Sequence, residues 1–360
     1  IATGLGNAHS SPDGYHHGSL SEQEQGEGII RMFEAMRREG YAGGIIFEWM
    51  DEWAKKTWTT EPYMIPYDRH IIWHNVIDPE QNYGLLAMES VKPSKPQSIH
   101  DGVGFIKQIA LSGDVSYLWI DIELAGTVSL EDRPLFIGLD TYERNRGELR
   151  YLPDASFESP SGMEFLIELD GVETSRLLTI GPYNSTSYRY ASHPDLQKSG
   201  QFEVMARLTN KERALADGTP IEAKYEDSSA LRYGPVDRPG SHWYVQGNHI
   251  SIRIPWGRIN VTDPSEARVL DDGRIFYSDP ERDKLNTAVS QGIGVSALMI
   301  DKKKQRLVDS LPLQGTTEPL YFEWSWWNQP VYSQRLKESY EMLQSYFIRK
   351  SDTYRTVRQE

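Results

Sequence analysis

The acidic residues Glu48, Asp51 and Glu52 follow directly after an apolar stretch, within GYAGGIIFEWMDEWAKKTW at residues 40–58. Carboxylates held at the end of a buried strand can act as acids, bases or hydrogen-bonding groups toward a substrate. A single carboxylate near a strand end is also commonly a solvated loop residue or a helix cap. The clustering of three predicts a site here without identifying its reaction.

Three tryptophans, Trp49, Trp53 and Trp58, are interleaved with these carboxylates. Flat apolar rings beside hydrogen-bonding groups suit the faces and hydroxyls of pyranose rings, so sugar binding is the chemistry that this combination favours. Tryptophans are more often part of a core than of a ligand platform. Both interpretations remain open for each ring.

The elements that must position these residues can be read from the preceding sequence. Ser21 and Glu24 form an S-x-x-E capping box, and apolar residues at helical spacing follow until Gly40, which predicts one amphipathic helix. The small and aliphatic residues 42–47 indicate a strand buried on both faces, as in a parallel sheet. Residues 1–48 therefore predict a loop, a helix and a strand, which make one α/β repeat.

The pattern changes to period two after a Pro- and Lys-containing linker at residues 91–97. Strands with alternating apolar positions, separated by Gly, Pro, Asn and Asp clusters, predict an antiparallel β-sandwich over residues 98–332. The alternating positions are Leu118, Ile120, Ile122 and Leu124; Met163, Phe165, Ile167 and Leu169; Ile250, Ile252 and Ile254; and Leu320, Phe322, Trp324 and Trp326.

Residues 333–360 are expected to form a C-terminal helix and a frayed tail. Leu336, Tyr340, Leu343 and Phe347 give an apolar stripe that predicts docking on the sandwich or on the α/β part. The fold class expected for the whole chain is mainly β with an α/β part.

Composition limits the functions that this chain of 360 residues can have. A formal charge of −14 argues against nucleic acid or anionic membrane as a partner, because either would require a basic surface. Zero cysteines exclude disulfides, thiolate nucleophiles and cysteine-ligated zinc. The sequence contains no apolar run long enough to span a membrane.

One loop offers hard oxygen ligands. Asp140, Glu143 and Asn145 lie within DTYERNRGE, and such a loop can hold a structural calcium ion. An ordinary turn is the alternative. No cofactor is otherwise expected.

Residues 1–90 resemble the last quarter of the (β/α)8 barrel of clan A glycoside hydrolases, in an uncharacterised bacterial branch. The resemblance is carried by GYAGGIIFEWMDEWAKKTW, by HSSPDGYHHGSLSEQEQGE before it and by WHNVIDPEQNYGLLA after it. It implies that residues 42–48 are the eighth strand and residues 21–39 the seventh helix. Both catalytic glutamates of the clan would then lie on an upstream barrel segment or a companion chain.

The same resemblance assigns candidate substrate contacts. Trp49 or Trp53 would form the floor of the sugar subsite, and His16 and His17 would lie in the loop after the seventh strand, where the clan places substrate contacts. A solvated polar loop is the alternative for the two histidines. We expect the chain to be a fragment or processed product that is inactive alone.

The sandwich is similar to family 9 carbohydrate-binding modules. The similarity is carried by YLWIDIEL, PLFIGLDTYERNRGEL, FLIEL and HISIRIPWGRINVTDPS. Together the two resemblances imply a secreted or cell-surface glycoside hydrolase-like protein that acts on a polysaccharide. A non-catalytic glycan-binding protein with a degenerate barrel, or a sandwich that only buttresses the barrel, are the alternatives.

Overall fold

The computed structural model is mainly β, with antiparallel sheets and, in the residues that it describes, two α-helices. This confirms the coarse fold class, whereas the described residues contain no (β/α)8 barrel. The described residues are 8–11, 14–17, 20–51, 83–153, 157–184, 195–210, 212–227, 229–235, 241–271, 287–313, 316–324, 327 and 329–357.

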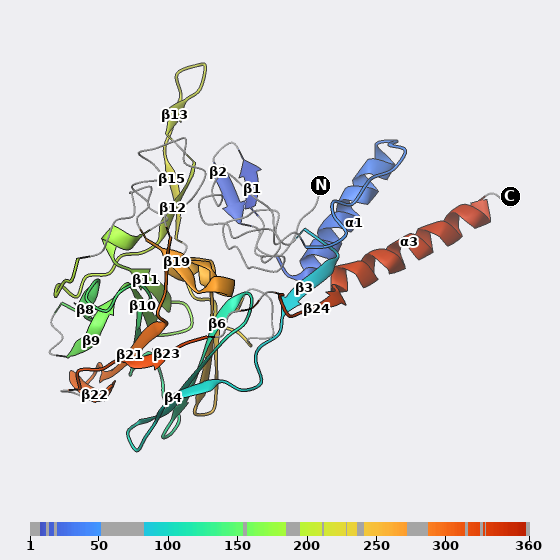
Figure 1. The fold of residues 1–360 in the computed structure, drawn as a ribbon. Coiled ribbons are helices and arrows are strands. Elements are labelled where there is room, and N and C mark those ends of the chain that lie inside the picture. The colour runs from blue at the N-terminus through green and yellow to red at the C-terminus, as the bar shows by residue number, and fades with distance from the viewer. Residues whose placement is uncertain are drawn as a thin grey trace.

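Two antiparallel sheets form the larger part of the molecule (Figure 1). The first has the order β16 (Trp243–Gln246), β17 (His249–Pro255), β6 (Tyr117–Leu124), β5 (Ile106–Gly113) and β4 (Gln97–Asp101). The second has the order β11 (Arg176–Thr179), β10 (Phe165–Leu169), β7 (Leu135–Asp140), β21 (Ile293–Asp301) and β22 (Arg306–Leu311), with β23 (Leu320–Phe322) also paired to β21.

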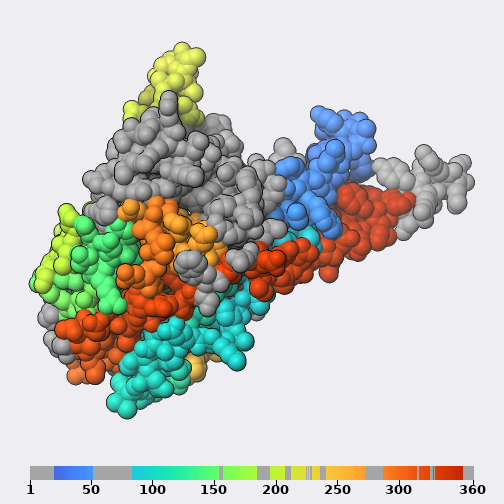
Figure 2. Space-filling model, viewed as in Figure 1, coloured from blue at the N-terminus to red at the C-terminus, as the bar shows by residue number. Residues whose placement is uncertain are grey.

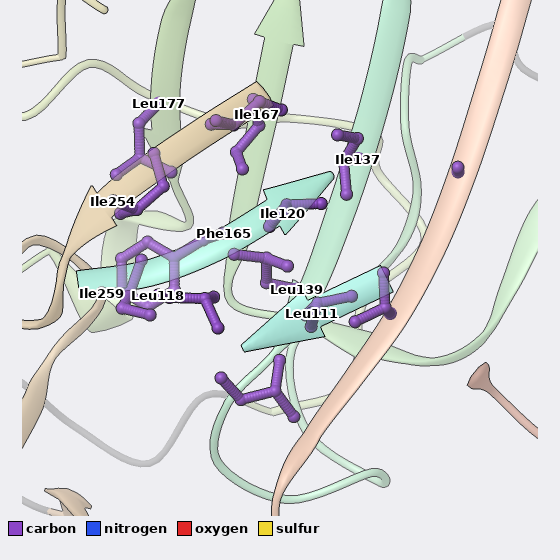
Figure 3. Close-up of a cluster of buried hydrophobic side chains, with 14 of the residues drawn as sticks. Leu111, Leu118, Ile120, Ile137, Leu139, Phe165, Ile167, Leu177, Ile254 and Ile259 are labelled. Carbon is purple, nitrogen blue, oxygen red and sulfur yellow. The ribbon is translucent and has the colours of Figure 1, made fainter. Parts of the chain in front are cut away.

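One hydrophobic core joins the two sheets (Figure 3). Leu118 and Ile120 of β6 and Ile254 of β17 pack with Ile137 of β7 and Phe165 of β10. The alternate residues of β6 point away from this core, as the period-two pattern predicts, because successive side chains of a strand point to opposite faces.

The second sheet is also covered on its outer face. Phe136, Met163, Leu166 and Leu298 lie on that face and pack with Tyr151 and Phe157 in a separate apolar cluster. The paired strands β8 (Glu148–Arg150) and β9 (Glu158–Met163) lie in this region. The central strands β7 and β21 are therefore buried on both faces, unlike the strands of a simple two-layer sandwich.

Smaller elements decorate the sandwich. One is a three-stranded sheet of β18 (Val261–Asp263), β19 (Arg268–Leu270) and β20 (Thr287–Val289). Three are strand pairs: β12 (Ala206–Asn210) with β15 (Lys224–Asp227), β13 (Arg213–Ala214) with β14 (Pro220–Ile221), and β1 (Ala8–Ser11) with β2 (Gly14–His17). The others are the 3₁₀ helices η2 (Gly181–Tyr183), η3 (Trp256–Ile259) and η4 (Pro264–Glu266).

A separate helical unit is formed by segments from the N-terminal and C-terminal parts of the chain. Helix α1 (Glu22–Arg38) packs against α3 (Glu338–Val357), and β3 (Leu86–Ser90) pairs with β24 (Tyr332–Leu336) beneath them. Figures 1 and 2 show this unit projecting from the side of the sandwich. Its apolar centre contains Ile29, Leu85 and Leu343.

The start of α1 follows the predicted capping box. The Ser21 hydroxyl accepts a hydrogen bond from the Glu24 amide at 3.1 Å, and the Glu24 carboxylate accepts one from the Ser21 amide at 2.7 Å. The C-terminal helix docks on α1, where Phe347 contacts Phe33 edge to face. Leu336 was predicted on the helical stripe, but it ends β24, because its backbone pairs with Leu86.

The predicted strand at residues 42–47 is wrong. These residues form no strand, and the Ile45 side chain is 90% exposed. A strand buried on both faces needs a hydrogen-bonded neighbour on each side. No described segment pairs with residues 42–47. After these residues, the next strand-like pairing along the chain is a parallel bridge between Met50 and Leu86.

Candidate functional site

The Glu48–Asp51 segment is anchored on the edge of β3. The Trp49 carbonyl accepts hydrogen bonds from the Leu85 and Leu86 amides at 2.9 and 2.8 Å, and the Asp51 amide donates to the Leu86 carbonyl at 3.0 Å. These bonds fix the backbone on both sides of Met50. The backbones of Trp49 and Asp51 are therefore held by the edge of β3 and not by the strand that the sequence predicts.

Asp51 points into the helical unit. Its Oδ1 accepts hydrogen bonds from the Lys337 ammonium at 2.6 Å and from the Gly84 amide at 3.0 Å, and the Asp51 and Lys337 side chains are almost fully buried. A Cβ on Gly84 would lie 2.2 Å from the Met50 carbonyl carbon, so only glycine permits this close approach. The Asp51 carboxylate therefore serves as a buried counter-charge and faces no substrate.

Further polar contacts join α1 to the start of α3 and to the end of β24. Gln25 is fully buried and accepts a hydrogen bond from the Ser339 hydroxyl at 2.7 Å. Glu22 binds the Arg335 guanidinium through both carboxylate oxygens and also accepts from the Glu338 amide. These contacts join residues more than 300 positions apart in the sequence, which is why sequence patterns could not reveal them.

Trp49 and Glu48 lie at the surface of the same unit. The Trp49 side chain is 56% exposed and meets the ring of Tyr340 edge to face, with 5.9 Å between ring centroids. Glu48 is half-buried beside it, and Phe47 makes an edge contact with Tyr83. Of the residues predicted in this stretch, the structure thus exposes the Trp49 ring, whereas one Glu48 carboxylate oxygen is enclosed by the protein.

Five further residues were predicted for this site. Glu52, Trp53 and Trp58 lie outside the described residues. The backbones of His16 and His17 lie in β2, where they pair with His9 and Ala8 of β1.

The three predicted calcium ligands lie in different environments. Asp140 is buried at the end of β7, whereas Glu143 and Asn145 are exposed, and Glu143 forms an ion pair with Arg146 at 3.5 Å. In the described part of the chain, no three His, Cys, Asp or Glu side chains are grouped to hold a metal ion. The loop site, which includes Asn145, stays a prediction.

Asp140 instead lies near a second buried acid, Glu164, which the sequence analysis did not select. Burial raises the pKa of Asp140 to about 7. Burial and the nearby Asp140 charge raise the pKa of Glu164 well above its ordinary value. Period two predicted that Met163 faces the same core as Phe165, but Met163 lies in the outer apolar cluster, so the alternation does not hold on either side of Glu164.

No protein-family model matches the chain, and no curated protein matches its sequence. None of the described helices has both the length and the apolar character needed to cross a membrane. The side-chain arrangement must therefore carry any assignment of function.

Proposed function

We propose that this chain is part of a glycoside hydrolase-like protein that acts on an extracellular or cell-surface polysaccharide, with the sandwich as a binding or supporting module. The observation that carries the proposal is the exposed ring of Trp49 in a segment that also contains Glu48. An aromatic face next to a hydrogen-bonding group is complementary to a pyranose ring. The family resemblance of the surrounding sequence favours the same substrate class.

The geometry around Trp49 suits a binding platform better than a core position. Its backbone is held by the amides of Leu85 and Leu86, and its ring meets Tyr340 edge to face. A large ring that the protein already holds in place loses little freedom when a ligand binds. Solvent exposure leaves apolar ring surface for a sugar to cover.

Glu48 is the carboxylate of this segment that we assign to polar contact with the glycan. Asp51 is excluded from that role by its buried ion pair with Lys337. Glu52 remains a candidate by sequence alone. In this proposal the catalytic glutamates are supplied by an upstream barrel segment or a companion chain, so the chain alone is inactive.

Exposed apolar side chains support the requirement for a companion segment. Tyr41, Ile45, Phe47 and Met50 all expose much of their surface along one short extended stretch. Contiguous exposed apolar surface commonly marks an interaction site. We propose that additional strands cover this stretch and complete an α/β layer next to the Met50–Leu86 bridge.

Glycan binding by a Trp49→Ala variant tests the proposal. We expect affinity for the bound polysaccharide to fall by at least about tenfold while the melting temperature changes little, because an exposed aromatic ring contributes more to binding than to folding. Tyr41→Ala is the matched control, since Tyr41 is also an exposed aromatic residue of this segment. If Trp49→Ala instead lowers stability by the roughly 3–5 kcal/mol typical of a truncated core tryptophan, the platform assignment is wrong.

A second measurement separates hydrolysis from binding. The chain should be assayed on polysaccharides alone and together with a barrel segment or companion chain that carries the two proposed catalytic glutamates. Hydrolysis only in the combined sample supports the enzyme proposal. Glycan binding without hydrolysis in either sample would favour a degenerate barrel that recognises glycan, and absence of both would leave the sandwich as a buttress.

A further inference from the structure

Two buried carboxyl groups of the sandwich each have an oxygen without a hydrogen-bond partner. Asp140, at the end of β7, is 4% exposed, and Glu164, directly before β10, is 0% exposed. Among the described residues, neither Asp140 Oδ2 nor Glu164 Oε1 has a hydrogen-bond partner. Buried polar atoms are normally satisfied, so a pair of unsatisfied carboxylate oxygens needs an explanation.

The other contacts of Glu164 hold it in a fixed orientation. Glu164 Oε2 accepts hydrogen bonds from the amides of Thr141 and Tyr142 at 2.7 and 3.2 Å, which places this carboxylate next to the backbone that follows Asp140. The buried Ser161 hydroxyl oxygen and Asp140 Oδ2 both lie beside Gly294. Glu164 is therefore anchored on one side and leaves an oxygen available on the other.

The protein supplies little positive charge to this acid pair. No ion pair joins a described Lys or Arg to either group. Arg144 lowers the pKa of Asp140 through its charge, but its guanidinium is engaged with Glu318 at 3.0 Å and lies over the ring of Tyr321. Two adjacent carboxylates in an apolar environment are costly unless a cation or a proton neutralises them.

A glycine lies beside the unsatisfied oxygen of Asp140. Gly294 of β21 is the register partner of Asp140. A Cβ at this position would lie 3.0 Å from Asp140 Oδ2 and 3.1 Å from the Ser161 hydroxyl oxygen, which is tighter than an ordinary contact. Gly294 is not among the glycines with positive φ. Alanine is therefore disfavoured here by the lack of space for its methyl group and not by the backbone conformation.

We propose that Asp140 and Glu164 bind one calcium ion, with the Ser161 hydroxyl beside them. The donors are oxygens only, and two carboxylates match the charge of a hard divalent cation, whose remaining ligands would be carbonyl oxygens or water. This site shares Asp140 with the loop site predicted from the sequence but replaces Glu143 and Asn145 by Glu164. It is independent of glycan recognition at Trp49.

Thermal unfolding of the full chain with calcium and with excess chelator, at about pH 8, tests the proposal. Calcium should raise the melting temperature of the wild-type protein, since a ligand that binds only the native state stabilises it, and calorimetric titration should give one ion per chain. The isosteric variant Glu164→Gln should lose both responses. Gly294→Ala should weaken them because its methyl group enters the site.

Two control variants make the assignment specific. Glu168→Gln, on the same strand as Phe165 but away from the pair, should keep the wild-type calcium response, and so should Glu143→Gln. Loss of the response in Glu143→Gln but not in Glu164→Gln would return the site to the loop and overturn the proposal. A wild-type melting temperature that is unchanged by calcium, together with a Glu164→Gln variant more stable than wild type, would show that the pair holds a proton and not a metal ion.

Discussion

The helical unit and the sandwich each bury carboxylates, but they neutralise them differently. In the helical unit, Asp51 receives the Lys337 ammonium at 2.6 Å, and both charges are enclosed. In the sandwich, Asp140 and Glu164 lie close enough to interact electrostatically, and no described cation pairs with either one. The first arrangement is complete within the protein, whereas the second can still accept a ligand.

This difference shows why a buried carboxylate is not by itself evidence of a catalytic site. Glu48, Asp51 and Glu52 form an acidic cluster in the sequence, and this cluster predicted a site. In the structure, Asp51 instead forms a buried ion pair with Lys337. Glu164 has no motif around it and nevertheless has an unsatisfied oxygen. The partners of a charge, more than its sequence neighbours, decide what it can do.

The largest expected effect comes from removing the counter-charge in the helical unit. Lys337→Met should lower the free energy of unfolding by about 3–5 kcal/mol, because Asp51 would remain buried without its ion-pair partner. Urea unfolding measures the change. The double variant Asp51→Asn, Lys337→Met should recover part of the loss, since it no longer buries a charge. A Lys337→Met variant as stable as wild type would show that the pair is not required.

A second prediction concerns the pH dependence of the sandwich when calcium is removed by chelator. The pKa of Asp140 is raised from 3.8 to about 7, so the native state binds this proton more tightly than the unfolded state. Its contribution to stability is complete below about pH 4 and is lost as the pH rises through about 7. Urea unfolding should show a steeper loss of stability between about pH 4 and pH 7 in wild type than in Asp140→Asn. Equal slopes would contradict the assignment of this shift to Asp140.

The smallest effect is expected at the start of α1. Ser21→Ala should lower the free energy of unfolding by about 1 kcal/mol, because the Glu24 amide loses its capping oxygen. Thermal or urea unfolding can measure this change, and Ser21→Asp should retain most of the stability. A neutral Ser21→Ala variant would indicate that packing against α3 alone holds the first turn of α1.

Local patterns predicted the elements whose signals lie within a few residues. The capping box at Ser21 marks the start of α1, and the alternation at residues 118–124 gives the core-facing side of β6, because both signals arise from short-range backbone geometry. Residues 42–47 have the composition of a buried strand but form none, because pairing depends on a neighbouring segment that composition does not specify.

The candidate sites were less predictable for the same reason. Trp49 was selected from the sequence, and its ring is exposed at the surface. The Lys337 partner of Asp51 is 286 positions away, and the amides that bind Glu164 belong to Thr141 and Tyr142, which are 23 and 22 positions away. Only the folded arrangement separates a neutralised carboxylate from one that still has an unsatisfied oxygen.

The central claim is that the helical unit supplies its own counter-charge and the acid pair of the sandwich does not. The most direct test is to compare the free energies of unfolding of Lys337→Met and Glu164→Gln, side by side in excess chelator at about pH 8. The account predicts changes of opposite sign: Lys337→Met destabilises by leaving a buried charge, and Glu164→Gln stabilises by removing one. Destabilisation of similar size in both variants would contradict it.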